Sequence, residues 1–233
     1  MPDIGDVILW YVVFLFSLTL HEVGHAWTSE LFGDSTGRYL GRISLNPLVH
    51  IDPIGTVVFP LVGALTGIPL FGWAKPVPVN PLRWRDQVKA NIAVSAAGPL
   101  ANLLITIIAL ALIKLLIWQG VFELSYNFNL WHFIKATEPS PFFSPLATML
   151  CIAVSTNVGL AVFNMLPIPP LDGSHILASV LSLISQPLLD AYEQVRSYGF
   201  MVLMLFLIID RQLKLLSIIF LPILSFIFLL VGY

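Results

Sequence analysis

The sequence predicts an all-α polytopic membrane protein, a transmembrane helix bundle with a small membrane-associated β-hairpin and a re-entrant or surface segment. Of its 233 residues, 58% are hydrophobic and only 10% are charged, a charged share well below that of ordinary soluble domains. The mean hydropathy is +0.90, and several apolar runs are long enough to cross a bilayer. We therefore expect one integral membrane domain over residues 1–233, with a catalytic core at about 7–176 and C-terminal helices at about 177–233.

The overall charge and the single cysteine narrow the class of protein further. A formal net charge of -2 and an isoelectric point near 6.2 indicate no basic surface for nucleic acid, so we expect no nucleic-acid partner. Cys151 stands alone in an apolar stretch, which argues against a disulfide framework or a thiolate metal cluster. Asp3 and Asp6 stand where a cleaved signal peptide has its basic region, so we expect the first helix to be retained.

The first third of the chain predicts one span followed by polar and interrupted segments. Residues 7–32 form an apolar run long enough for a membrane helix, which Gly33 ends. Residues 34–50 are polar and alternating, a pattern typical of a short strand or hairpin. Residues 54–73 are apolar but interrupted by glycine and proline, and residues 75–89 are polar and rich in proline.

The rest of the chain predicts two clear spans and a set of further helices. Residues 92–118 form the longest uninterrupted apolar run, and residues 146–166 form another span. Between them, residues 120–145 predict a loop whose aromatic side chains settle at a membrane interface. The C-terminal part is expected to hold an interfacial helix and two apolar helices, at residues 174–185, 198–209 and 213–231.

Two histidines and a carboxylate occur together at the end of the first apolar run, as His21, Glu22 and His25. Positions i and i+4 of a helix share a face, so the two histidines can present ring nitrogens to a single ion. Zinc prefers imidazole ligands, and in the pattern H-E-x-x-H the glutamate takes a proton from the attacking water. Ionisable groups are costly in a bilayer, which favours a functional site over core histidines and a helix cap.

Asp172 is the candidate third ligand. A catalytic zinc site needs three protein ligands and an open position for water, and the histidines supply only two. Asp172 follows a span, and the prolines before it (Pro167, Pro169 and Pro170) cannot continue a helix, so the backbone must unwind. Irregular backbone is tolerated at membrane depth only where it is buried in protein or lines a cavity. Taken alone, Asp172 could also be a turn acid at the membrane surface.

Three motifs together carry a family resemblance. They are His21-Glu22-Val23-Gly24-His25, Gly98-Pro99-Leu100-Ala101-Asn102, and Asn164-x-x-Pro167 followed by Leu171-Asp172-Gly173. In order and spacing, the chain resembles the site-2 protease family of intramembrane zinc metalloproteases, in a minimal form without PDZ or CBS modules. The resemblance covers the chain from about residue 7 to residue 176.

The resemblance implies a zinc metalloendopeptidase with Zn2+ as its cofactor, which hydrolyses peptide bonds within or near transmembrane segments, as in regulated intramembrane proteolysis. The implied roles are zinc ligation for His21, His25 and Asp172, general base catalysis for Glu22, and a polar contact near the scissile carbonyl for Asn164. A transmembrane protein substrate and the lipid bilayer are the expected partners. A metal transporter or a non-catalytic membrane scaffold using the same zinc site is the alternative.

Parity and charge predict the side of the membrane. The helix with the histidines ends at one face of the membrane, and the loop of Asp172 must reach the same face to bind the same ion. If residues 54–73 and 92–118 both crossed the membrane, residues 146–166 would bring Asp172 to the opposite face, so one of these two segments should not cross. Residues 54–73 are the candidate for a re-entrant or surface segment, because glycine and proline interrupt them. Basic residues then gather on the motif side, which the positive-inside rule makes cytoplasmic in a multi-pass protein of the cell membrane. They are Arg38, Arg42, Lys75, Arg83, Arg85 and Lys89, against Lys135 in the opposite loop.

Further polar residues leave alternatives open. Asn102, inside a span, is a candidate for binding an unwound substrate strand, and it could equally stabilise the site or join two helices. His175 is expected beside the metal rather than on it, because Asp172 already completes the ligand set. Residues 41–45 predict either an edge strand that pairs with an extended substrate or a plain hairpin.

Overall fold

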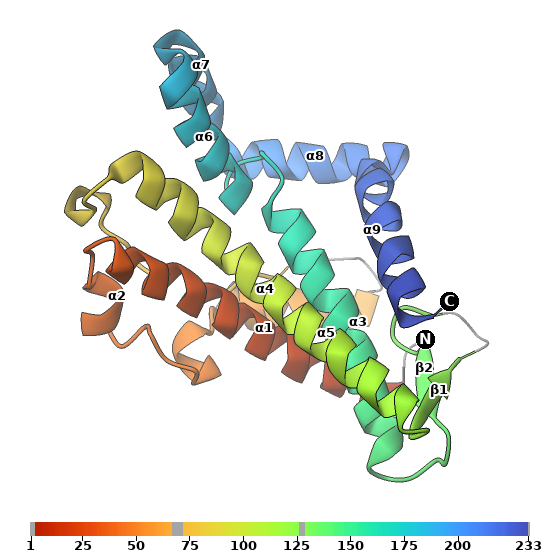
Figure 1. Cartoon of the computed structure of the whole chain (residues 1–233). Helices are drawn as coiled ribbons and strands as arrows, with labels where there is room; N and C mark the ends of the chain where they lie inside the picture. The colour runs from red at the N-terminus through yellow and green to blue at the C-terminus, as the bar shows by residue number, and fades with distance from the viewer. Residues whose placement is uncertain (1–2, 67–71, 126–128, 233) are drawn as a thin grey trace.

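Three long helices lie at the centre of the molecule and pack against one another, namely α1 (Ile4–Leu31), α4 (Gln87–Trp118) and α5 (Phe143–Asn164) (Figure 1). The structure, a computed structural model, describes residues 3–66, 72–125 and 129–232. The three helices have 28, 32 and 22 residues and are long and apolar enough to cross a membrane. The described part of the chain is therefore a helical, multi-pass membrane protein, which confirms the predicted fold class.

The three spans lie within a few residues of their predicted positions. α4 begins earlier than hydropathy indicated, because the Asp86 side chain accepts a hydrogen bond of 3.0 Å from the Lys89 N–H and caps the helix. A 3-10 turn, η3 (Pro81–Arg83), precedes this cap. α1 and α4 cross closely at Gly24, where a Cβ would lie 2.8 Å from the Ala97 carbonyl oxygen. The histidine motif is thereby placed directly against α4.

Short helical turns follow α1, and the strand or hairpin predicted for residues 34–50 is wrong. The segment contains α2 (Thr36–Tyr39) and the 3-10 helix η1 (Pro47–His50). Asp34 and Asn46 each accept a hydrogen bond of 3.1 Å from the backbone N–H two residues further along. Such bonds favour turns over extended strands, although the polar residues that make them resemble the outward positions of a strand.

The sheet of the described residues lies instead in the aromatic region predicted as a loop between α4 and α5. Strands β1 (Phe122–Leu124) and β2 (Ile134–Ala136) form an antiparallel pair in which Glu123 is opposite Lys135. A small hairpin is therefore present, but in another place than predicted. Residues 41–45, described in full, form a turn and bends, so the edge strand suggested there is also wrong.

The two ends of the interrupted apolar segment before α4, residues 54–73, lie next to each other. It contains a π-helical turn, η2 (Pro53–Val58), and α3 (Phe59–Thr66), whose eight residues extend only about 12 Å. The Trp73 N–H donates to the Gly55 carbonyl at 3.3 Å, and the Trp73 carbonyl accepts from Thr56 Oγ1 at 2.8 Å. Both ends of the segment are therefore side by side, as expected for a re-entrant or surface segment.

Four further helices follow α5 in the described part of the chain: α6 (Asp172–Ile184), α7 (Gln186–Arg196), α8 (Gly199–Leu213) and α9 (Leu215–Val231). Hydropathy did not predict α7, because many of its side chains are polar. α7 and α8 meet at a bend of 78°. In Figure 1, α6 and α7 project beyond one end of the bundle, α8 lies across that end, and α9 runs back toward the sheet. There Val231 of α9 joins the same apolar cluster as Phe122 of β1.

Candidate metal centre

His21 and His25 lie on consecutive turns of α1 and face Asp172, the first residue of α6. His21 Nε2 is 3.2 Å from Asp172 Oδ2, and His25 Nε2 is 3.4 Å from Asp172 Oδ1. Ligand atoms of the three side chains all lie within 4.8 Å of one another. Tetrahedral ligands about 2 Å from a zinc ion are themselves separated by about 3.3 Å. The fold therefore brings the three predicted ligands together at the spacing that a metal ion requires.

The second nitrogen of each imidazole determines its tautomer. His21 Nδ1 is 2.7 Å from Asn102 Oδ1, and His25 Nδ1 is 2.6 Å from the carbonyl oxygen of Val94. Both partners are acceptors, so each Nδ1 donates its hydrogen there, and in the neutral ring each Nε2 has a lone pair available for a cation on the side of Asp172. Asp172 Oδ2 is buried and receives no hydrogen bond within the described residues. Two imidazole nitrogens and a carboxylate that face one another at this spacing fit a cation, and their chemistry fits zinc.

Gly98 of α4 makes room for both histidines. A Cβ at this position would lie 2.5 Å from His25 Nε2 and 2.6 Å from His21 Nε2. At Gly173, beside the third ligand, a Cβ would lie 2.3 Å from the Met165 carbonyl oxygen. In the sequence Gly98 stands out only as part of the motif Gly98-Pro99-Leu100-Ala101-Asn102, and its close approach to the candidate ligand atoms becomes visible only in the folded chain.

Asn102 is fully buried and joins the three central helices at His21. Besides the contact with His21, its Nδ2 donates to Ser17 O at 3.3 Å and to Asn157 Oδ1 at 2.8 Å. Asn157 in turn donates to Ser17 Oγ at 2.9 Å. These contacts favour the site-stabilising alternative for Asn102, because its amide points at the ligand and at neighbouring helices and does not line the cavity. Sequence reasoning missed Asn157 and Ser17.

The candidate metal centre opens into a cavity of about 1480 Å³. Glu22 and Asn164 line it together with the three candidate ligands. Glu22 Oε2 accepts a hydrogen bond of 2.9 Å from the Val77 N–H. Asn164 Nδ2 donates to Leu160 O at 2.9 Å, which orients its amide at the end of α5. Both predicted polar residues therefore face the space into which the ligands point.

His175 also lines the cavity but is turned toward α7. Its Nδ1 lies 2.5 Å from Arg196 Nη2 and accepts a hydrogen bond there, since arginine can only donate. Burial, together with the Arg196 charge, lowers the pKa of His175 below its usual range and keeps the ring neutral. Among the described residues, the group that could hold a metal does not include His175. The structure thus places it beside the centre, as expected.

Two histidines from one span, a carboxylate from the unwound end of another and a glutamate on the cavity wall define an intramembrane zinc metalloprotease. A model of Peptidase family M50, the site-2 protease family, matches residues 9–208, and the chain belongs to this family. The resemblance noted from the motifs, the zinc cofactor and the protease activity are thereby confirmed. The transporter and scaffold alternatives are not favoured.

Two relatives illustrate the similarity. A Bacillus subtilis protein named as a candidate zinc metalloprotease, YwhC, is 33% identical over 228 residues, which cover 91% of this chain and 93% of that protein. A Mycolicibacterium smegmatis protein with the same description, Rip2, is 32% identical over 206 residues, covering 88% of this chain and 68% of that protein. No solved structure matches the chain.

Proposed function

We propose that His21, His25 and Asp172 hold the zinc ion and that Glu22 is the general base. The observation that carries this assignment is the convergence of three ligand atoms within 4.8 Å, with both Nδ1 atoms already committed to acceptors. The catalytic core is then residues 7–176 of a single membrane domain. Residues 177–233 add helices that cover one end of the bundle and one side of the cavity.

The cavity residues suggest how each would act on a peptide bond. Zinc, when bound, supplies Lewis acidity for the scissile carbonyl and makes water more acidic. Glu22 takes the proton of the attacking water and delivers it to the leaving amine. Asn164 uses one amide hydrogen on Leu160 O, so the other remains free to donate to the developing oxyanion or to the substrate backbone.

The size and character of the cavity support a transmembrane segment as substrate. Apolar residues of several helices form much of its wall, among them Trp10, Phe14, Phe163, Leu203 and Phe220. A helix about 10 Å wide that rises 1.5 Å per residue occupies roughly 120 Å³ per residue. The cavity of about 1480 Å³ therefore has room for several residues of such a segment. We infer hydrolysis within or near such a segment, as in regulated intramembrane proteolysis.

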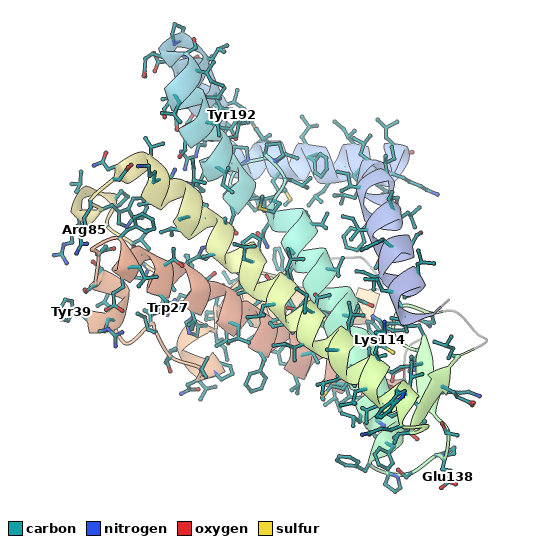
Figure 2. The ribbon with its side chains drawn as sticks, viewed as in Figure 1. Trp27, Tyr39, Arg85, Lys114, Glu138 and Tyr192 are labelled. Carbon is teal, nitrogen blue, oxygen red and sulfur yellow. The ribbon has the colours of Figure 1, made fainter. Side chains whose placement is uncertain are left out.

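Charge supports a cytoplasmic position for the site in the cell membrane. In Figure 2, Arg85 and Tyr39 extend at the end of the bundle where α4 begins, while Lys114 and Glu138 lie toward the opposite end. Arg38, which pairs with Glu30, and Arg85, whose N–H donates to the Phe32 carbonyl, lie at the end at which α1 finishes. This bias is the one that the positive-inside rule associates with the cytoplasm. The N-terminus of α1 would then lie outside.

The proposal is tested with the purified chain in detergent or liposomes and a panel of single-span membrane proteins. We expect at least one of them to be cut within or near its span, with loss of cleavage on chelation and recovery on addition of zinc. The matched control is Glu22→Gln, which keeps the side-chain size and the zinc. Chelator-resistant cleavage, or equal cleavage by wild type and Glu22→Gln, would overturn the assignment.

A further inference from the structure

A buried arginine, Arg42, lies near the proposed base without touching it. Only 7% of this residue is exposed. Its guanidinium donates to three backbone carbonyls, those of Val49, Lys75 and Pro76, with 3.1 Å between Nη2 and Pro76 O. Burying a cation is costly unless it is well hydrogen-bonded. Three carbonyl partners on two segments offset much of this cost and show what Arg42 holds, while the buried Nε has no partner among the described residues.

The segment held by Arg42 passes Glu22 on its other side. Pro76 and Pro78 have no N–H group, so Val77 carries the backbone donor between them. That N–H is the one that donates to Glu22 Oε2 at 2.9 Å. The Pro76 carbonyl and the Val77 N–H belong to the same peptide unit, which is planar and points these two groups in opposite directions when trans. Arg42 therefore donates to the carbonyl of the Pro76–Val77 peptide, and the N–H of the same peptide donates to Glu22.

We propose that Arg42 is a positioning residue for the catalytic base, acting on Glu22 through the Pro76–Val77 peptide. The inference rests on the proposed role of Glu22. Fixing Oε2 on the Val77 N–H leaves Oε1 as the oxygen that takes the proton from water. The positive guanidinium also polarises the Pro76 carbonyl, which strengthens the N–H on the opposite side as a donor.

Other contacts anchor the same segment, so its general path does not depend on Arg42. At one end, the Lys75 N–H donates to His50 O at 2.8 Å. At the other end, the Asn80 N–H donates to Asp34 Oδ2 at 2.6 Å. Burial raises the pKa of Asp34, but the hydrogen bonds that it accepts outweigh this and bring its pKa below the usual value. An ionised Asp34 keeps the far end in place when Arg42 is replaced.

The test compares Arg42→Gln and Arg42→Lys with Arg38→Gln, a matched control at an exposed arginine of the preceding helix α2. The substrate is the panel protein that wild type cleaves in a chelator-sensitive manner. For Arg42→Gln we expect kcat to fall about 10- to 100-fold, the effect of losing a hydrogen bond to a charged group. KM and zinc content should stay at wild-type values. Arg42→Lys should recover part of kcat, and Arg38→Gln should cleave normally.

A second pair of variants tests the peptide itself. Val77→Pro removes the donor, whereas Val77→Ala shortens the side chain and keeps the N–H. We expect Val77→Pro to reproduce the loss of kcat and Val77→Ala to retain most of it. The double variant of Arg42→Gln and Val77→Pro should be no slower than the slower single variant, because both act through one hydrogen bond.

Three results would overturn the inference while leaving the role of Glu22 intact. They are a normal kcat in Val77→Pro, fully additive losses in the double variant, or a loss of zinc from Arg42→Gln that accounts for its loss of activity. If Arg42→Gln does not fold, Arg42→Lys replaces it in the single and double variants, and a wild-type kcat in Arg42→Lys would then overturn the inference. Equal cleavage by wild type and Glu22→Gln would instead refute the base itself.

Discussion

Replacing Gly98 by alanine should strongly weaken zinc binding while leaving helix α4 intact. The new Cβ would lie 2.5 Å from His25 Nε2 and 2.6 Å from His21 Nε2. Favourable contacts of a carbon atom begin at about 3.5 Å, so the rings would have to move by roughly 0.9–1 Å. Zinc sites tolerate only about ±0.2 Å in ligand distance. Losing a group that hydrogen-bonds a metal ligand typically lowers metal affinity by about 10- to 100-fold. Because here the ligands themselves are displaced, we expect zinc affinity to fall by at least about 100-fold.

The measurement is zinc content by elemental analysis, together with competition against a chelator of known affinity. Glycine to alanine stabilises a helix by about 0.4–1 kcal/mol only where the Cβ fits, and here overpacking at the two rings opposes that gain, so the thermal unfolding of the metal-free variant is compared with metal-free wild type to show that it still folds. Gly5→Ala is the matched control, because the nearest atom to its Cβ is Asp3 Oδ2 at 3.6 Å. Wild-type zinc affinity in Gly98→Ala would show that His21 and His25 do not bind zinc in the position in which their Nε2 atoms lie against Gly98.

Three further predictions concern the ligands, the base and the topology. His25→Ala and Asp172→Ala should each lose most of the zinc by elemental analysis, and undiminished zinc in a folded variant would exclude that ligand. Glu22→Gln should keep the zinc and lose about 10²- to 10⁴-fold in cleavage rate, the usual contribution of a general base; a wild-type rate would assign the proton transfer to another group. An engineered Arg85→Cys should react with a membrane-impermeant thiol reagent added from the cytoplasmic side, and labelling only from the outside would contradict the re-entrant segment before α4.

The spans and the candidate ligands that the structure brings together could be predicted from the sequence, because both follow from local patterns. Apolar runs determine the spans, and the spacing of His21 and His25 places them on one helix face whatever the tertiary structure. The prolines before Asp172 likewise end a helix by their own chemistry. The hairpin could not be located in this way, because Asp34 and Asn46 initiate turns in a segment whose polar alternation also suits a strand.

The remaining features of the site depend on contacts between distant segments, which no local pattern encodes. The Val77 N–H reaches Glu22 across 55 positions of the chain, and Asn102 reaches His21 across 81. Both contacts are made by residues whose types allow several roles. A valine between two prolines suggests an extended segment, and an asparagine in a span suggests helix association. Only the packing of α4 and of residues 74–80 on α1 brings these groups to the proposed base and to a proposed zinc ligand.

The same polar contacts couple the stability of the bundle to the geometry of the site. Ser17, Asn102 and Asn157 are all at least 98% buried, and their hydrogen bonds join α1, α4 and α5. In a membrane no water replaces a lost partner, so a shift of one helix would leave polar groups unsatisfied at a cost of several kcal/mol each. Because Asn102 also holds His21 Nδ1, the packing that satisfies this network is the packing that orients the ligand. The arrangement therefore selects one helix register, the one in which His21 faces Asp172.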